Sequence, residues 1–368
     1  MRNLKRALSL TLASVMLLGM MVIGTSAAAG YSDVDENDNV EAIEVLQTIE
    51  VMVGDDRGFG PDRPVTRNEM AVVMGKLLNL DYNYYASACP FTDVAEWAKG
   101  WVGACAANGI VSGRGEGIYD GEATVTAVEA ASMMMRALGY FQYTEDYDDG
   151  FVLATVRQGS DIGIFNGVGS DGNTPMTRNQ VAQMALNALR SNMVIFTGTP
   201  GIDVNGVKIN YRAEYTPRTG TDAKYDSIEG LVTTIGGDNS QFYIQLGEQL
   251  YDGDLRLEGS KDVFGRPARY WEYDGQEIGT YAKKELLRKE YTTKVTGRDL
   301  YDQLGSTLIN GRGWTLDVAI DGDDTDNTLL FDETSITRTN KDSVGGTEKG
   351  VLTQVYVDNT AKRAYVVI

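Results

Sequence analysis

The chain has 368 residues, with 52 acidic against 33 basic side chains, no histidine and two cysteines. Its length suffices for two or three domains with cores of their own. A net charge of −19 repels nucleic acid and anionic lipid, so we expect neither as a partner. The lack of histidine excludes histidine-based catalytic triads and nearly every zinc site, and two cysteines cannot build a cysteine-only metal site. We therefore expect no metal and no cofactor.

The N-terminus has the three parts of a secretory signal peptide. Arg2, Lys5 and Arg6 are followed by the uncharged residues 7–23, rich in leucine and methionine, and by small residues at 25–29. An uncleaved membrane anchor is the alternative, but this uncharged run is at the short limit for a spanning helix. We expect cleavage after residue 28 or 29, secretion, and no membrane span after cleavage.

The region that follows contains one pattern three times, which is the signature of a repeat protein. In each copy, apolar or small residues fall at offsets 4, 7, 8, 11 and 12 from a threonine, which is the spacing of one helical face. The copies begin with Val65-Thr66-Arg67-Asn68-Glu69, Val125-Thr126-Ala127-Val128-Glu129 and Met176-Thr177-Arg178-Asn179-Gln180. Upstream of each lies a segment that ends in glycine (Gly54, Gly113 and Gly167), where we expect a turn with positive φ.

Each unit is thus predicted to be a helix, a glycine turn and a capped helix. A single pair of short helices cannot bury its apolar stripe, so the three units should pack together. Two units also share an aromatic-x-Asp-Val start, at residues 31–34 and 91–94, which residues 148–151 of the third match only loosely.

These starts, the GI-x-x-G turns and the TRxE helix starts make residues 31–194 resemble the S-layer homology domain. That family binds cell-wall polysaccharide and usually occurs in threes. The resemblance implies an all-α pseudo-threefold helical bundle behind the signal peptide (1–29), with repeats at 30–84, 85–144 and 145–195. A domain of unknown role would follow at 196–368.

The threonine and the third helical residue of each copy match a capping box. In this motif the threonine oxygen accepts from the backbone of the third residue, whose side chain accepts from the threonine N–H. Each box should stabilise its helix by about 1 kcal/mol, and we interpret all of these residues as structural. The pairs are Thr66 with Glu69, Thr126 with Glu129, and Thr177 with Gln180.

Arg67 and Arg178 occupy the first helical position, where the helix dipole disfavours a cation. Helix amides plus a guanidinium would make an anion pocket, whereas an internal ion pair or a solvated side chain is the ordinary alternative, and spacing leaves both open. The family resemblance implies that this arginine holds an acidic, pyruvylated wall sugar. Because the second repeat has Ala127 there, we expect two competent sites, with that repeat silent.

Trp97 matches a tryptophan that the family often carries in its first helix. It could stack on a sugar face, but its helical spacing favours the core, as it does for Trp101. Gly54 and Gly167 are turn glycines that could also let a ligand approach the backbone closely.

Cys89 and Cys105 are candidates for one disulfide, which would close a loop of about 16 residues and contribute roughly 3 kcal/mol. Two free thiols are the alternative.

Two acidic clusters have some features of cation-binding loops. In residues 33–44, however, Asp38 stands where a calcium loop needs glycine, so we interpret this cluster as a helix start and surface. Residues 321–326 are predicted to form a turn between strands.

Beyond residue 195 the helical period disappears, and runs rich in Val, Ile, Tyr and Thr alternate with Asn-Gly and Asp-Gly pairs. We expect a β-rich domain, with a hairpin at Asp274-Gly275 and a short helix at 282–290, so the fold class is multidomain α+β. Residues 264–267 loosely resemble segments of surface proteins from anaerobic Gram-positive bacteria. The strand-like run at 364–368 fits either the front of a longer protein or a last strand at the terminus.

These features predict a non-enzymatic protein of the cell wall or S-layer, anchored non-covalently to an acidic secondary cell-wall polysaccharide. Other S-layer subunits are further expected partners. The main alternative is a wall-anchored glycan hydrolase with its active site in 200–368, because a glycosidase needs only two carboxylates, such as Glu272 and Glu277. Binding of an exogenous carbohydrate or a host surface by the β-rich part is the other alternative.

Overall fold

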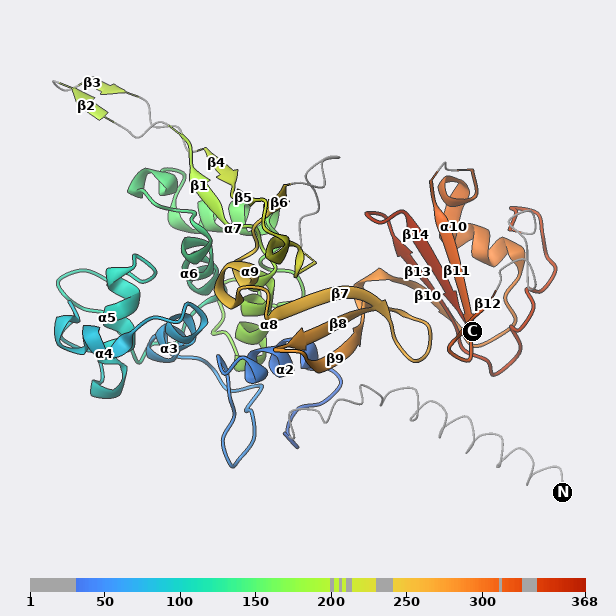
Figure 1. Cartoon of the computed structure of the whole chain (residues 1–368), viewed down its shortest axis with the longest axis horizontal. Coiled ribbons are helices and arrows are strands. Elements are labelled where there is room, and N and C mark those ends of the chain that lie inside the picture. The colour runs from blue at the N-terminus through green and yellow to red at the C-terminus, as the bar shows by residue number, and fades with distance from the viewer. Residues whose placement is uncertain are drawn as a thin grey trace. The chain divides into compact units, whose positions relative to one another are not determined.

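The protein contains both helices and strands and is of mixed α+β type (Figure 1). The computed structural model describes residues 31–198, 202–204, 207–209, 214–229, 241–310, 313–325 and 336–368. The predicted signal peptide lies outside these residues, as do both residues of the Asn205-Gly206 pair and the glycine of the other Asn-Gly pair, at position 311. Two compact units are present: the described residues of the larger lie within 31–257 and 272–278, and those of the smaller within 258–271 and 279–368. The position 195/196, predicted as a domain boundary, lies inside the larger unit.

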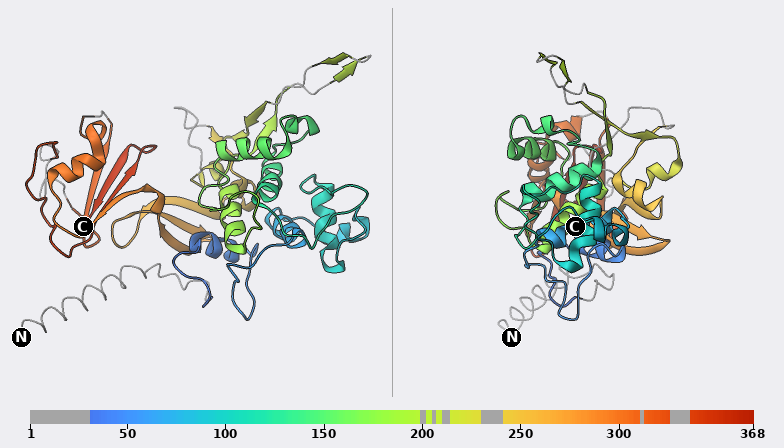
Figure 2. Two further views of the ribbon diagram at one scale, coloured as in Figure 1. Left: turned by 180° about the vertical axis from the view of Figure 1, so that it is seen from behind. Right: turned by 90° about the vertical axis from the view of Figure 1, so that its left-hand side faces the viewer.

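The larger unit contains two main helices in each repeat. They are α2 (Val40–Thr48) and α3 (Arg67–Leu77), then α5 (Lys99–Ala107) and α6 (Ala127–Leu138), then α7 (Phe151–Asp161) and α8 (Arg178–Leu189). Short elements between them are α4 (Tyr82–Tyr85) and 3-10 turns at Ala86–Ala88, Glu96–Ala98 and Thr144–Tyr147. The second helix of each repeat packs on the first helix of the next: α3 on α5, α6 on α7, and α8 back on α2. These helices gather together in both views of Figure 2.

The three repeats meet in a closed ring of backbone hydrogen bonds. The N–H of Val65 donates to the carbonyl of Met176, that of Met176 to Val125, and that of Val125 to Val65, each at 2.9 Å. The three side chains are at most 1% exposed. The predicted apolar stripe is confirmed, since its members are buried except Leu78 and Ala137, which are half-buried. Since each of the three residues gives one bond and receives one, the repeats close on themselves instead of forming an open stack.

After α8 the larger unit continues with short strand pairs and one helix. Antiparallel pairs join β1 (Val194–Phe196) to β4 (Tyr215–Pro217), β2 (Ile202–Val204) to β3 (Val207–Ile209), and β5 (Thr219–Gly220) to β6 (Phe242–Tyr243); a 3-10 turn (Ala223–Asp226) and α9 (Leu246–Tyr251) complete the segment. The N–H of Leu246 donates to Ser191 (3.1 Å), and the N–H of Met193 donates to Ile244 (2.8 Å). These bonds attach the segment to the end of α8.

Glu248 of α9 is fully buried and binds the backbone around it. Its carboxylate accepts hydrogen bonds from the N–H groups of Ser227 (3.1 Å), Ile228 (3.1 Å) and Gln245 (2.8 Å). Burial raises the pKa of Glu248 to about 7, and the three hydrogen bonds offset this effect only in part.

Strands β7 (Leu255–Lys261), β8 (Pro267–Tyr273) and β9 (Gln276–Ala282) form a sheet in that order. The predicted hairpin is confirmed: Asp274 and Gly275 link β8 to β9 with φ values of 49° and 70°, as a tight hairpin turn requires. The short helix predicted at 282–290 is wrong. Only Lys284–Leu286 forms a 3-10 turn, and Leu287–Tyr291 is strand β10, because its pairing with β13 outweighs local helix propensity.

The smaller unit contains a five-stranded sheet of order β10-β13-β14-β11-β12. Its remaining strands are β11 (Thr315–Ile320), β12 (Asp323–Thr325), β13 (Thr353–Asp358) and β14 (Arg363–Val367). Of the turn predicted at 321–326, only Asp321 and Gly322 link β11 to β12, with positive φ at both, because Asp323–Thr325 pairs with β11 as a strand. Helix α10 (Gly297–Asn310), which the sequence analysis missed, contributes Leu300 and Leu304 to a core with sheet residues such as Val318 and Val355.

Candidate functional site

Arg178, at the start of α8, reaches into the glycine turn of the first repeat. Its Nε donates to the carbonyl of Phe59 (2.8 Å) and its Nη2 to the carbonyl of Val53 (2.9 Å). The guanidinium carbon lies 4.5 Å from the centroid of the Phe59 ring, and the side chain is half-buried. The third repeat thus completes the turn of the first, and we name this contact the first junction.

Arg67 makes the same contacts with the turn of the second repeat, which we name the second junction. Its Nε donates to Tyr119 (3.0 Å), its Nη2 donates to Ser112 (2.9 Å), and its guanidinium carbon lies 4.6 Å from the Tyr119 ring centroid. Unlike Arg178, it is only 4% exposed and forms an ion pair with Glu129 (3.3 Å). Val53 and Ser112, the carbonyls held by the two arginines, each directly precede a turn glycine, Gly54 or Gly113.

The third junction joins the start of α6 to the third repeat, through a bridge between Thr126 and Pro175. Ala127 is the first residue of α6, so the position without an arginine belongs to the turn that contains Gly167. We expected the second repeat to be the one without an arginine site; in the structure, the turn without an arginine is that of the third repeat. The helix of one repeat completes the turn of another, and Gly54 and Gly113, not Gly54 and Gly167, belong to the junctions with arginine.

The turn glycines are required for two different reasons. Gly167 has φ = 71°, as predicted, but Gly54 and Gly113 do not have positive φ. A Cβ at Gly54 would lie 2.4 Å from the ring of Tyr31, and one at Gly113 would lie 2.5 Å from the ring of Phe91. The aromatic residue that starts each of these repeats therefore packs directly on the turn and leaves no room for a side chain.

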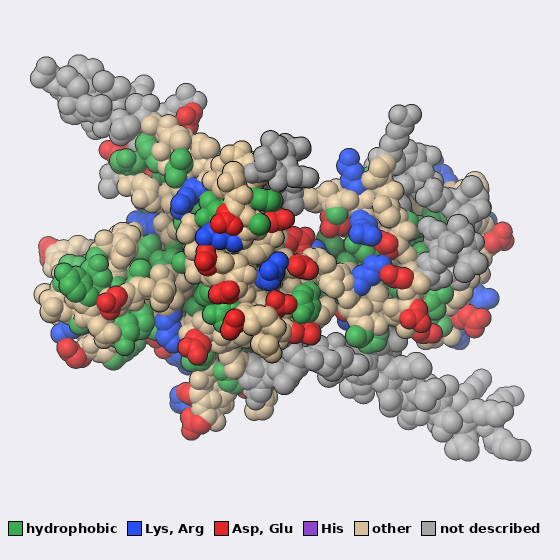
Figure 3. All heavy atoms as spheres, in the orientation of Figure 1, with side chains coloured by type: hydrophobic (Ala, Val, Ile, Leu, Met, Phe, Trp, Pro, Cys, Tyr) green, Lys and Arg blue, Asp and Glu red, His purple; other side chains and the backbone are tan. Residues whose placement is uncertain are grey.

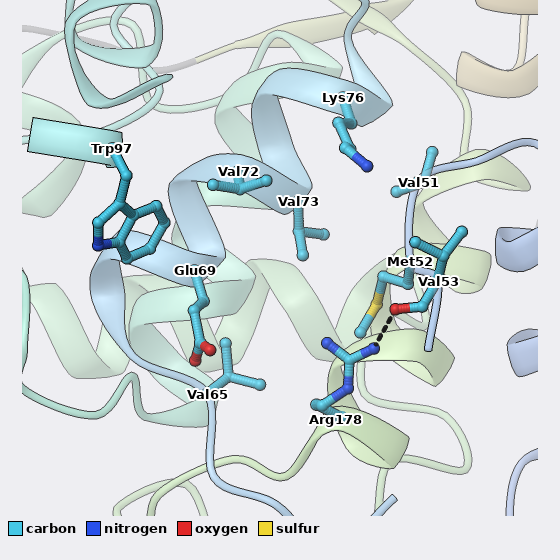
Figure 4. Close-up of a pocket in the computed structure, with 10 residues that line it drawn as sticks. All are labelled: Val51, Met52, Val53, Val65, Glu69, Val72, Val73, Lys76, Trp97 and Arg178. Carbon is cyan, nitrogen blue, oxygen red and sulfur yellow. Dashed lines mark hydrogen bonds between the residues drawn. The ribbon is translucent and has the colours of Figure 1, made fainter. Parts of the chain in front are cut away.

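A cavity of about 200 Å³ lies beside Arg178 in the first junction (Figure 4). The apolar part of its wall comes from Val51, Met52, Val53, Val65, Val72 and Val73, and its polar part from Glu69, Lys76 and Arg178. Trp97 also lines it and is 57% exposed. The prediction that Trp97 is a core residue is wrong, because the 3-10 turn at Glu96–Ala98 directs Ala98 into the core instead. Trp101 is half-buried and stacks on Tyr82.

The charges around this cavity are unevenly paired. Burial acts to raise the pKa of Glu69, but hydrogen bonds from the Thr66 N–H and from Arg63 (2.5 Å) hold the pKa below its usual value. Burial and then repulsion from Arg63 lower the pKa of Arg178, although a guanidinium remains charged at neutral pH. Among the described residues, no carboxylate lies within ion-pair distance of Arg178. A bound anion would compensate this charge.

All three helix starts have the geometry of a capping box. The threonine Oγ1 accepts from the third helical N–H at 3.2–3.3 Å, and the side chain of that third residue accepts from the threonine N–H at 2.9–3.0 Å. The residues are Thr66 and Glu69, Thr126 and Glu129, and Thr177 and Gln180. The second oxygen of each glutamate faces its junction, where Glu69 contacts Arg63 and Glu129 contacts Arg67 and Arg114.

Two aspartates that the sequence analysis did not assign to the site hold the aromatic rings beneath the arginines. Asp33 accepts from the N–H groups of Phe59 (2.9 Å) and Gly60 (2.7 Å), and Asp93 accepts from those of Tyr119 and Asp120 (2.8 Å each). These bonds lower the pKa of both aspartates. The shared aromatic-x-Asp-Val start was the signal for this role.

The expected disulfide is not formed, and Cys89 and Cys105 are free thiols. Cys105 points from α5 into the core, where its thiol donates to the carbonyl of Ala71 (3.4 Å), and burial raises its pKa to about 12. Cys89 is half-buried, after the 3-10 turn at Ala86–Ala88.

The carboxylates considered for a hydrolase, Glu272 and Glu277, lie on β8 and β9 on either side of the hairpin turn. Glu277 is exposed and Glu272 is half-buried, and neither lines the cavity.

Acidic and basic side chains are interspersed on the face shown in Figure 3. Within the part of the chain that the structure describes, we find no helix with the length and apolarity needed to cross a membrane.

Comparison with known proteins identifies a family in the first two repeats. The model of the S-layer homology domain matches residues 30–71 and 90–130. A cell surface protein of Thermoanaerobacter kivui is 26% identical over 354 residues, which cover 84% of this chain and 44% of that protein. A surface layer protein of Brevibacillus choshinensis is 23% identical over 307 residues, covering 76% of this chain and 26% of that protein.

The chain thus spans less than half the length of either relative. Both relatives are named for the cell surface or the surface layer, and the matched domain is one that binds cell-wall polysaccharide in general. The N-terminal part of the chain therefore contains S-layer homology domains in its first two repeats, and the chain is similar to surface-anchored proteins of the S-layer type.

Proposed function

We propose that residues 31–194 form one module of three S-layer homology repeats that anchors an exported protein to the cell wall. Its ligand is an acidic, pyruvylated secondary cell-wall polysaccharide, bound without a covalent link. The remaining chain is displayed at the surface, where it joins other S-layer subunits. This role involves no catalytic step.

The observation that supports this proposal best is the cavity beside Arg178. It combines a half-buried cation that has no carboxylate within ion-pair distance among the described residues, a second cation at Lys76, and an apolar wall that includes Val65, Val72 and Val73. A pyruvate ketal carries a carboxylate and a methyl group on one carbon, which match the cations and the valines. The exposed Trp97 offers a ring face to the sugar.

The two arginine junctions should differ in strength. Arg67 already pairs with Glu129, which also pairs with Arg114 at 3.2 Å, so an anion would have to compete with an existing carboxylate. Arg178 has no such competitor among the described residues. We therefore assign the first junction as the stronger site and the second junction as the weaker one.

Sedimentation of the full chain with purified wall sacculi tests this function. Arg178→Ala should weaken binding about ten- to a hundredfold, because it removes a charge-assisted contact with the anion. Arg67→Ala should weaken binding less, because Arg67 contributes to the weaker site. Arg57→Ala is the control, since Arg57 lies in the first repeat, as Arg67 does, is 85% exposed and, among the described residues, forms an ion pair with Asp55 alone. It should bind like the parent.

Two outcomes would contradict the proposal. The first is a parent chain that stays in solution with native sacculi. The second is equal binding to sacculi whose acidic polymer has been stripped, because the anion would then contribute nothing.

A further inference from the structure

The three turns contain one equivalent carbonyl that needs a hydrogen-bond donor, and the third turn obtains it differently. Val53, Ser112 and Asn166 each directly precede a turn glycine. The carbonyls of Val53 and Ser112 accept from Nη2 of an arginine in another repeat, both at 2.9 Å. The carbonyl of Asn166 accepts instead from Nδ2 of Asn187, at 2.7 Å, within its own repeat.

The hydrogen bonds of Asn187 occupy its whole amide. Its Nδ2 also donates to the carbonyl of Ile164 (3.0 Å), and its Oδ1 accepts from Nε2 of Gln183 (3.0 Å). The side chain is 1% exposed. Both N–H donors therefore bind the turn, and none is left for a ligand.

Three further substitutions accompany this exchange at the third junction. Ten residues after the capping threonine, where Lys76 and Arg136 stand in the other repeats, the third repeat has Asn187 itself. Gln180 replaces the glutamate of the capping box. Seven residues before the threonine, Ser170 stands where Phe59 and Tyr119 lie under the arginines. The cations, the acid and the ring of the other junctions are thus absent at these positions.

We infer that Asn187 is a positioning residue that replaces the inter-repeat arginine at the third junction. It holds the turn at Gly167 in shape without a charge, so Ala127 and Asn187 form a matched pair. The third junction then stabilises the ring of repeats but takes no anion. This inference rests on the proposed function for its statement about the ligand, whereas the exchange of donors concerns the fold alone.

Hydrogen–deuterium exchange of the full chain tests the donor exchange without any ligand. The readout is the protection of three amides of the turn: that of Ile164, which donates to Gly159 of α7, and those of Asn166 and Val168, which are hydrogen-bonded within the turn. Asn187→Ala should speed their exchange roughly tenfold, because two bonds to the turn are lost. Adding Ala127→Arg should restore protection, since an arginine there can reach the carbonyl of Asn166 as Arg67 reaches that of Ser112.

Gln183→Ala is the matched control. It removes the partner of the Asn187 Oδ1 but leaves both bonds to the turn, so protection should stay at the parent level. Unchanged exchange in Asn187→Ala, or exchange that stays fast in the double variant, would overturn the inference. If Asn187→Ala alone does not accumulate as folded protein, recovery of a folded chain by Ala127→Arg supports the inference, and failure to recover overturns it.

A binding measurement separates this inference from the proposed function. Titration of the chain with a pyruvylated wall fragment should show no added site in Ala127→Arg and one added site in Ala127→Arg/Asn187→Lys. A third site in the single variant would overturn the inference while leaving the anchor intact. A parent chain that binds no fragment would contradict the anchor, and the exchange experiment would still decide the role of Asn187.

Discussion

The guanidinium carbon of Arg178 lies 4.5 Å from the centroid of the Phe59 ring, although 119 residues separate the two in the chain. The contact joins the last repeat to the first. The carboxylate of Asp33 accepts a hydrogen bond from the N–H of Phe59, and the cavity lined by Trp97 lies beside the guanidinium. A single candidate binding position is therefore assembled from all three repeats, because Trp97 belongs to the second.

The two arginines should differ in their effect on the free energy of unfolding. Arg67→Ala leaves Glu129 without its buried partner and removes two bonds to backbone carbonyls, so it should cost about 3 kcal/mol. Arg178→Ala should cost less, about 1–2 kcal/mol, because the side chain is half-buried and its loss leaves no described carboxylate without an ion-pair partner. Urea unfolding of both variants measures the difference. An equal cost would show that burial of Arg67 adds no stability.

The capping boxes should each contribute a similar free energy. Thr126→Ala removes the acceptor of the Glu129 N–H and should lower the free energy of unfolding by about 1 kcal/mol. Thr126→Ser keeps the hydroxyl and is the control, expected to remain close to the parent. Chemical denaturation compares the three proteins, and a serine variant as unstable as the alanine variant would assign the effect to the methyl group instead.

The two thiols should react with alkylating reagents at very different rates. Cys89 is half-buried and should be modified in the native chain, whereas Cys105 is fully buried, with its pKa raised to about 12, and should react only after unfolding. Intact mass after alkylation counts the modified thiols: one in buffer and two in denaturant. A chain that takes no label even in denaturant without reductant would instead contain the disulfide.

Glu248 should make stability depend on pH near neutrality. Burial raises its pKa from 4.5 to about 7, so between these values the folded state holds a proton that the unfolded state has released. Stability present at low pH is therefore lost as pH rises through 7, by at most about 3 kcal/mol. The measurement is the free energy of unfolding at pH 5 and pH 8 for the parent and Glu248→Gln. The variant should lose this slope, and parallel curves would contradict the assignment.

Most of the fold of the repeats could be predicted from local sequence patterns. The threonine and the third helical residue specify a cap by their own hydrogen bonds, and the apolar offsets specify the buried face, so both features were predictable. Strand pairing was less so: residues 287–291 pair with β13, far along the chain, and that contact is not encoded in their own sequence.

The candidate site was predictable in its residue types but not in its partners. The position of Arg178 at the start of α8 indicates a candidate ligand contact. It does not indicate that the guanidinium donates to the carbonyl of Val53, which is 125 residues away in the chain. The third junction could not be predicted from the sequence either. In the repeat alignment Asn187 is one more polar residue of a helix, and only the structure shows its amide donating to the carbonyl of Asn166. The prediction that Trp97 lies in the core was wrong because α-helical spacing does not apply at Glu96–Ala98, where the chain forms a 3-10 turn.

The closed ring of Val65, Val125 and Met176 takes one residue from each repeat, so it is complete only when all three repeats are present. A chain that is delivered across a membrane amino end first exposes the cavity of the first repeat long before Arg178 arrives to complete it. In such a chain, the Val53 carbonyl gains its guanidinium donor from Arg178 only when the third repeat is also present. On the proposed function, attachment to the wall would therefore follow completion of the whole module.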